Sequence, residues 1–111
     1  MMRGHGKCFM NIKDLAKAYE RLLEAEQAYI DGRHSTAIAK IGGAFTSLAL
    51  AYEKGVISTD EWKKLNGALY HVREAIISFS PVEELIDKVD IAKKMFFDKI
   101  LEKYYQCMRY K

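Results

Sequence analysis

The chain has 111 residues, with 18 Lys and Arg against 15 Asp and Glu, and contains two Cys and one Pro. A chain of this length is expected to form one domain whose hydrophobic core needs no metal or disulfide to hold it together. No apolar run reaches the ~20 residues of a membrane-spanning helix, and the basic start has no apolar stretch that could serve as a signal peptide. Composition therefore excludes a membrane protein.

Cys8 and Cys107 lie close to opposite ends of the chain. Two cysteines so far apart do not make the framework of a disulfide-rich secreted domain. We therefore expect free thiols, a reducing compartment and a cytoplasmic protein. Lys and Glu are plentiful, while Asn and Gln occur only twice each, which is a thermophile-like composition.

Residues 1–10 show no hydrophobic periodicity, and we expect them to form a flexible N-terminal tail, followed by a single helical-bundle domain over residues 11–111. The first predicted helix spans residues 11–30, with Asn11 as its N-cap and Gly32 beyond its end. Its apolar residues, among them Ile12, Leu15 and Tyr19, recur every three or four positions, as on one face of a helix.

The second predicted helix begins near Ser35 or Thr36 and ends at Lys54. Apolar residues at heptad spacing form its seam, namely Ile38, Ile41, Phe45, Leu48 and Tyr52. Because this helix carries few charges, we expect it to be the buried, central one. Gly42 is expected to contact the backbone of a neighbouring helix, so that replacing it by Leu would overpack the core.

Ser58 and Glu61 are spaced as a capping box that starts a third helix, whose apolar seam runs from Trp62 to Phe79. Ser80 and Pro81 mark the start of a fourth helix that we expect to continue to about residue 110. The expected fold is all-α: a compact antiparallel bundle of four helices, or of five, with a long basic C-terminal helix.

No residue pattern indicates catalysis or a metal centre. His5 and Cys8 form an H-x-x-C pair, but a structural zinc site needs four ligands, usually in two close pairs. No Glu precedes a His by three residues, as it does in di-iron bundles, and no Gly-rich loop for ATP or GTP is present. We therefore expect neither an enzyme nor a cofactor.

The C-terminal helix has more apolar residues than one packing face uses. Two adjacent rows can be drawn: Phe96, Ile100, Tyr104 and Cys107 form one, and Phe97, Leu101, Tyr105 and Met108 form the other. One row suffices to pack on the bundle. The second predicts a subunit interface, formed by Phe97, Leu101 and Met108, unless a further helix buries both rows.

Basic and aromatic side chains alternate with these rows. Cations contact phosphates, and aromatic rings stack on unpaired bases. We therefore predict a nucleic-acid-binding surface made of Lys93, Lys94, Lys99, Lys103, Tyr105, Arg109 and Lys111. The favoured function is a small helical assembly protein, a homo-oligomer or a subunit of a larger complex, that contacts RNA or DNA. The alternative is a structural or protein-interaction module, such as a coat-type subunit or a regulatory partner, without nucleic acid.

Overall fold

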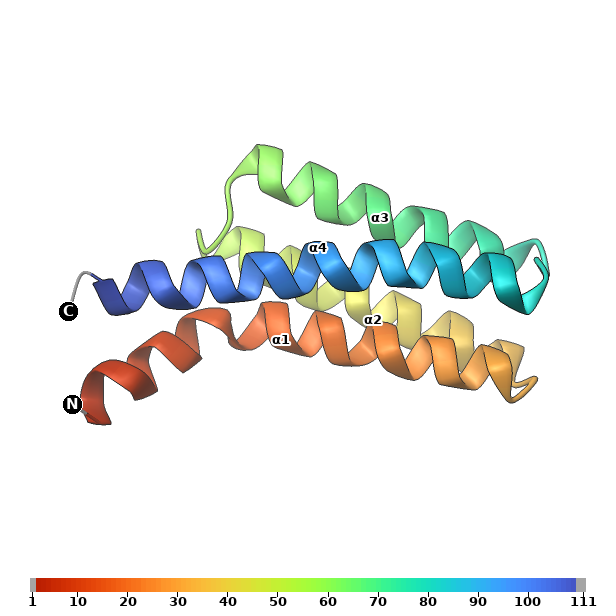
Figure 1. The fold of residues 1–111 in the computed structure, drawn as a ribbon, viewed down its shortest axis with the longest axis horizontal. Coiled ribbons are helices and arrows are strands. Elements are labelled where there is room, and N and C mark those ends of the chain that lie inside the picture. Colours follow the sequence, from red (N-terminus) through yellow and green to blue (C-terminus); the bar gives the residue numbers. More distant parts are fainter. Residues whose placement is uncertain (1, 110–111) are drawn as a thin grey trace.

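The computed structural model describes residues 2–109, and over that range its only regular secondary structure is helical. Four helices follow one another: α1 (Met2–Ile30), α2 (His34–Glu53), α3 (Thr59–Ile77) and α4 (Val82–Arg109). They lie side by side, and both ends of the chain lie at the same end of the elongated molecule (Figure 1). The all-helical prediction is confirmed, and no fifth helix is present between residues 2 and 109.

The four helices enclose one hydrophobic core. α1 and α3 each pack against both α2 and α4, so no single helix is central. Every helix contributes fully buried side chains to the core, including Leu15, Leu22, Ile41, Leu48, Leu65, Leu69, Val72, Leu85, Val89 and Phe96. The molecule measures 46 × 26 × 21 Å, which matches helices of 19 to 29 residues lying roughly parallel to its long axis.

The N-terminal segment differs from the prediction. α1 begins at Met2 rather than at Asn11, so that the segment expected to be a tail is helical from its second residue. The reason is Cys8, which is fully buried and forms a disulfide with Cys107 of α4. Cys8 lies four residues before Ile12 and extends the apolar stripe of α1 by one turn. The expectation of two free thiols is therefore wrong.

α2 faces the core with most of the predicted seam, since Ile41 and Leu48 are fully buried and Phe45 and Tyr52 pack against the core, but the buried face is shifted toward a row of alanines. Three alanines at seven-residue spacing, Ala37, Ala44 and Ala51, are buried together with Ile41 and Leu48. Ile38 and Gly42 are exposed, and a Cβ added to Gly42 would meet no atom within 4 Å. The expected contact between Gly42 and a neighbouring helix is therefore wrong, because the alanines provide the small surface on which other helices pack.

The start of α3 agrees with the sequence. The Glu61 backbone N–H donates to Ser58 Oγ over 3.1 Å, and the Ser58 N–H donates to Glu61 Oε1 over 2.8 Å, which completes the capping box. The end of α3 comes earlier than predicted. Phe79 lies beyond the helix in the left-handed region, with φ of 56°, and its ring is exposed. α4 then runs without a break to Arg109.

We predict that Gly42→Ala stabilises the protein by about 0.5 to 1 kcal/mol, because Ala restricts the unfolded chain and favours the helix while its methyl group meets open space. The free energy of unfolding in urea measures the effect. Gly43→Ala is the matched control: its Cβ would lie 3.4 Å from the Arg21 side chain, so that a smaller gain is expected. A loss of stability in Gly42→Ala would contradict the exposed position of Gly42.

Candidate functional site on α4

Four buried residues fix α4 against the core, and this sets where its other side chains lie. Leu85, Val89, Ala92 and Phe96 are buried. Side chains on one flank of this row contact α3, and those on the opposite flank contact α1. The remaining positions of α4 face away from the bundle.

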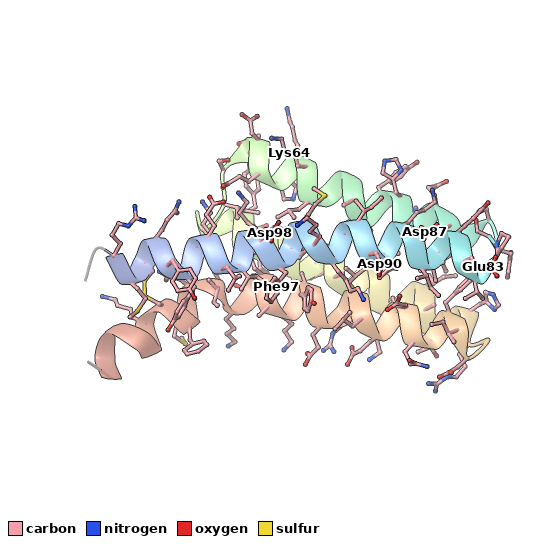
Figure 2. All side chains as sticks on the ribbon, in the orientation of Figure 1. Lys64, Glu83, Asp87, Asp90, Phe97 and Asp98 are labelled. Carbon is pink, nitrogen blue, oxygen red and sulfur yellow. A yellow bond between two sulfur atoms is a disulfide. The ribbon has the colours of Figure 1, made fainter. Side chains whose placement is uncertain are left out.

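The predicted interface residues lie toward α1 and the outer face. Phe97 is 51% exposed, and its ring centroid lies 6.4 Å from that of Tyr19 of α1 (Figure 2). Leu101 is also exposed, while Met108 is half-buried. Both apolar rows of the sequence are thus explained: Phe96 enters the core, and the row beginning at Phe97 remains accessible.

Aromatic contacts extend this accessible row onto α1. Phe9 is 60% exposed, and its ring lies 5.3 Å from that of Tyr104, which in turn lies 5.7 Å from the ring of Tyr105. We use the name apolar strip for the surface formed by Phe9, Tyr19, Phe97, Leu101, Tyr104 and Tyr105. Sequence reasoning missed the contribution of α1, because Phe9 was assigned to the tail and Tyr19 to the first core stripe.

Most of the predicted nucleic-acid-binding cations are paired with carboxylates. Lys99 Nζ lies 2.9 Å from both Glu61 Oε2 and Glu102 Oε1, and Lys103 Nζ lies 3.0 Å from Glu61 Oε1. Lys93 pairs with Asp90 and Glu26, and Lys94 pairs with Asp98. Arg109 is exposed and has no ion pair with another described residue, Tyr105 is 61% exposed, and Lys111 lies outside the described residues.

The cations and the apolar row do not form one surface. Lys99 and Lys103 lie on the flank of α4 that faces α3, because both reach Glu61 at the start of that helix. Phe97 lies on the opposite flank, beside α1. A partner that covers Phe97 therefore does not at the same time meet these two lysines.

Glu61 is the electrostatic centre of the α3–α4 contact. Burial raises the pKa of its carboxyl, but hydrogen bonds from the Ser58 N–H, Lys99 and Lys103 outweigh burial and lower the pKa to about 2. Burial lowers the pKa of Lys99, but its hydrogen bonds to Glu61 and Glu102 raise it by more. Lys99 is therefore firmly charged, and the protein's own anions hold both Lys99 and Lys103.

Charge is distributed unevenly along α4. Glu83, Asp87 and Asp90 lie in its N-terminal half, whereas Phe97 and Asp98 lie near its middle (Figure 2). The final turn carries Arg109. Ile91, between the acidic residues and the apolar strip, is exposed as well. The accessible face of α4 thus begins with acidic residues, carries the apolar row together with Lys94, Asp98 and Glu102 in its middle, and ends at Arg109.

The described residues give no sign of a metal centre: no three His, Cys, Asp or Glu side chains among them are grouped closely enough to hold an ion. No helix over residues 2–109 combines the length and the apolar character needed to cross a membrane. No protein-family model matches the chain, and no curated protein or solved structure is significantly similar to it.

The lowered pKa of Glu61 predicts a loss of stability in acid. A carboxyl whose pKa is lower in the folded than in the unfolded protein stabilises the fold above its unfolded value, 4.5, and this contribution disappears as the pH falls toward about 2. Glu61→Gln keeps an oxygen that accepts the Ser58 N–H but carries no charge. The thermal midpoint of the wild type should therefore fall more steeply than that of the variant between these pH values. Parallel curves would show that the pairing of Glu61 with the two lysines contributes nothing.

Proposed function

We propose that this protein is a self-associating helical assembly module, in which the apolar strip binds a second copy of the chain. The observation that carries the proposal is the strip itself, a run of accessible aromatic and aliphatic side chains on α1 and α4. Aromatic residues are enriched at protein interfaces, and contiguous exposed apolar surface marks interaction sites. Phe97, Leu101 and Met108, predicted as the subunit interface, lie on or beside this strip.

The charges on α4 favour a second copy as the partner. Most closed dimers use the same surface on both subunits, which must then be complementary to itself. When two copies of α4 lie alongside each other in opposite directions, the acidic half with Asp87 meets the final turn with Arg109. The apolar strips then meet near the middle, and the opposite charges fix the alignment of the two subunits.

The proposal assumes that successive helices within each subunit run in opposite directions, because short connections favour antiparallel neighbours. In that antiparallel arrangement, the start of α1 and the end of α4 meet at one end of the bundle. The strip then spans two helices rather than one, so that a partner is held against a surface of fixed shape. A rigid surface of this kind loses less conformational freedom on binding than a flexible tail does.

Nucleic acid is a second candidate partner, and a different observation supports it. Cations without an ion pair to another described residue gather in the half of the bundle that holds the chain ends, namely Lys7, Lys13, Lys17, Lys63, Lys64 and Arg109. Unpaired cations contact phosphates without first breaking an internal ion pair. If RNA or DNA binds, these residues are better placed for phosphate contacts than Lys99 and Lys103.

The proposal includes a cytoplasmic location, restricted to a thermophilic host because of the disulfide. Structural disulfides are rare in the cytosol of most organisms but frequent in that of hyperthermophiles. The Cys8–Cys107 bond and the scarcity of Asn and Gln are both in keeping with such a host. The proposed protein is thus a small assembly subunit of a thermophile's cytoplasm.

Self-association is tested by replacing two residues of the strip. The wild type is expected to have a mass twice the 12.8 kDa of the chain by light scattering. The double variant Phe97→Ser with Leu101→Ser should be monomeric with unchanged helical circular dichroism, because it loses apolar contact area but no core residue. The matched control, Ile38→Ser with Leu50→Ser, alters two exposed residues of α2 and should remain dimeric. A monomeric wild type refutes the proposal.

Nucleic-acid binding is tested separately. The second candidate predicts a raised 260/280 nm absorbance ratio in the purified protein and binding of labelled single- or double-stranded RNA or DNA at low salt. Replacing Lys13, Lys17 and Lys64 by Gln should weaken binding, and the salt dependence should lose about 0.7 to 0.9 in slope per phosphate contact removed. Replacing Lys99 and Lys103 by Gln is the control and should change binding little. If the Lys99 and Lys103 variant loses binding instead, the cations of α4 make the phosphate contacts. If the wild type binds neither RNA nor DNA, nucleic acid is refuted as the partner.

A further inference from the structure

A cleft of about 420 Å³ lies at the end of the molecule that holds both chain ends. Three parts of the fold form its walls: Asn11 of α1, Lys54 and Val56 at the connection between α2 and α3, and Lys103, Gln106 and Cys107 of α4. The apolar strip contributes none of these residues. The cleft is therefore a separate site, and the inference drawn from it is independent of self-association.

The wall of this cleft includes one of the two disulfide-bonded residues. Cys8 is fully buried, whereas Cys107 is half-buried and lines the cleft. The Asn11 side-chain N–H donates to Cys107 Sγ over 3.7 Å. A molecule that enters the cleft from solvent therefore reaches Cys107 and not Cys8.

The other groups of the cleft favour an anion. Lys54 Nζ lies 2.8 Å from Asp14 Oδ2, but the lysine side chain is 60% exposed and the aspartate side chain only 9%. Solvent therefore meets the ammonium group rather than the carboxylate. An ammonium has three N–H donors, and Asp14 accepts from one of them. Lys103 also lines the cleft, although Glu61 Oε1 holds its ammonium group over 3.0 Å, and the amides of Asn11 and Gln106 add neutral donors.

A further cation lies near the cleft. Lys7 is exposed, forms no ion pair with another described residue, and precedes Asn11 by one turn on the same side of α1. Carboxylates that face the region are already engaged: Asp14 with Lys54, and Glu61 with Lys99 and Lys103. A small anion in the cleft is thus attracted chiefly by the exposed ammonium groups of Lys54 and Lys7.

We propose that the cleft binds small anionic thiols and that the bound thiolate exchanges with the Cys8–Cys107 disulfide. The thiolate sulfur forms a bond to Cys107 Sγ, the bond between Cys107 and Cys8 breaks, and Cys8 leaves with the electron pair and takes a proton from water. The incoming thiol is oxidised to a mixed disulfide with Cys107, and Cys8 is reduced. A second thiolate then releases Cys107 as a thiolate and leaves as the small-molecule disulfide.

The exchange controls how the first turns of α1 are held. Cys8 joins these turns to α4 covalently, and the ring contact between Phe9 and Tyr104 accompanies that bond. Once the disulfide opens, only non-covalent contacts hold this segment of α1 against α4. The cleft therefore couples the supply of anionic thiol to the attachment of this segment.

Three small thiols that differ in charge test the proposal on the oxidised full chain at low salt: 3-mercaptopropionate, 2-mercaptoethanol and cysteamine. Second-order rate constants are compared per concentration of thiolate and are divided by those of the same thiols with a small uncharged disulfide, so that the ionised fraction and the intrinsic nucleophilicity of each thiolate both cancel. The anionic thiol should react at least about threefold faster than the cationic one. Peptide mapping by mass spectrometry should place the mixed disulfide on Cys107.

Matched variants identify the groups responsible for the preference. Lys54→Gln, alone and together with Lys103→Gln, should reduce the advantage of the anionic thiol, whereas Lys88→Gln, which removes the same charge at the opposite end of α4, should leave it unchanged. Circular dichroism checks that each variant is folded, and the single variant suffices should the double variant unfold. Equal rates for the three thiols overturn the proposal, as do an adduct on Cys8 and a preference that is insensitive to Lys54.

Discussion

The pairing of α1 with α2 is the most extensive helix contact in the molecule, and small side chains make it possible. Ala18 and Ala25 of α1 and Ala37, Ala44 and Ala51 of α2 are all completely buried. Alanines at seven-residue spacing bring the backbones together, while Leu and Ile at intervening positions fill the core between them. The positions of α3 and α4 follow, because each of them packs on one member of this pair.

The sequence predicted the number of helices and the start of α3 because these depend on local signals. Ser58 and Glu61 lie within one turn of each other, and capping needs no tertiary contact. Heptad spacing identified Ile41 and Leu48 of α2 as buried but did not fix the edges of the buried face, so that Ile38 and Gly42 were placed inside. The candidate site was harder to predict. Glu61 lies 38 positions before Lys99, and the charges of one segment do not indicate ion pairs with a distant one.

Glu61 links local structure to tertiary structure. The same carboxylate accepts the Ser58 N–H at the start of α3 and pairs with the ammonium groups of Lys99 and Lys103 of α4, so that one side chain contributes both to the cap of one helix and to its contact with another. This arrangement also decides which surfaces remain available to partners. Cations of α4 that turn toward α3 are satisfied internally, whereas the aromatic residues that turn toward α1 remain accessible.

The disulfide joins residues 99 positions apart, so that backbone and sulfur bridge together form a closed ring that contains nearly the whole chain. Closing a loop of this length lowers the entropy of the unfolded chain by an amount worth about 4 to 5 kcal/mol in the loop-entropy description. It also means that any one connection between helices can be cut without separating the chain into two molecules. A protease that cuts once between α2 and α3 leaves both halves in one molecule, because the disulfide between α1 and α4 then joins them.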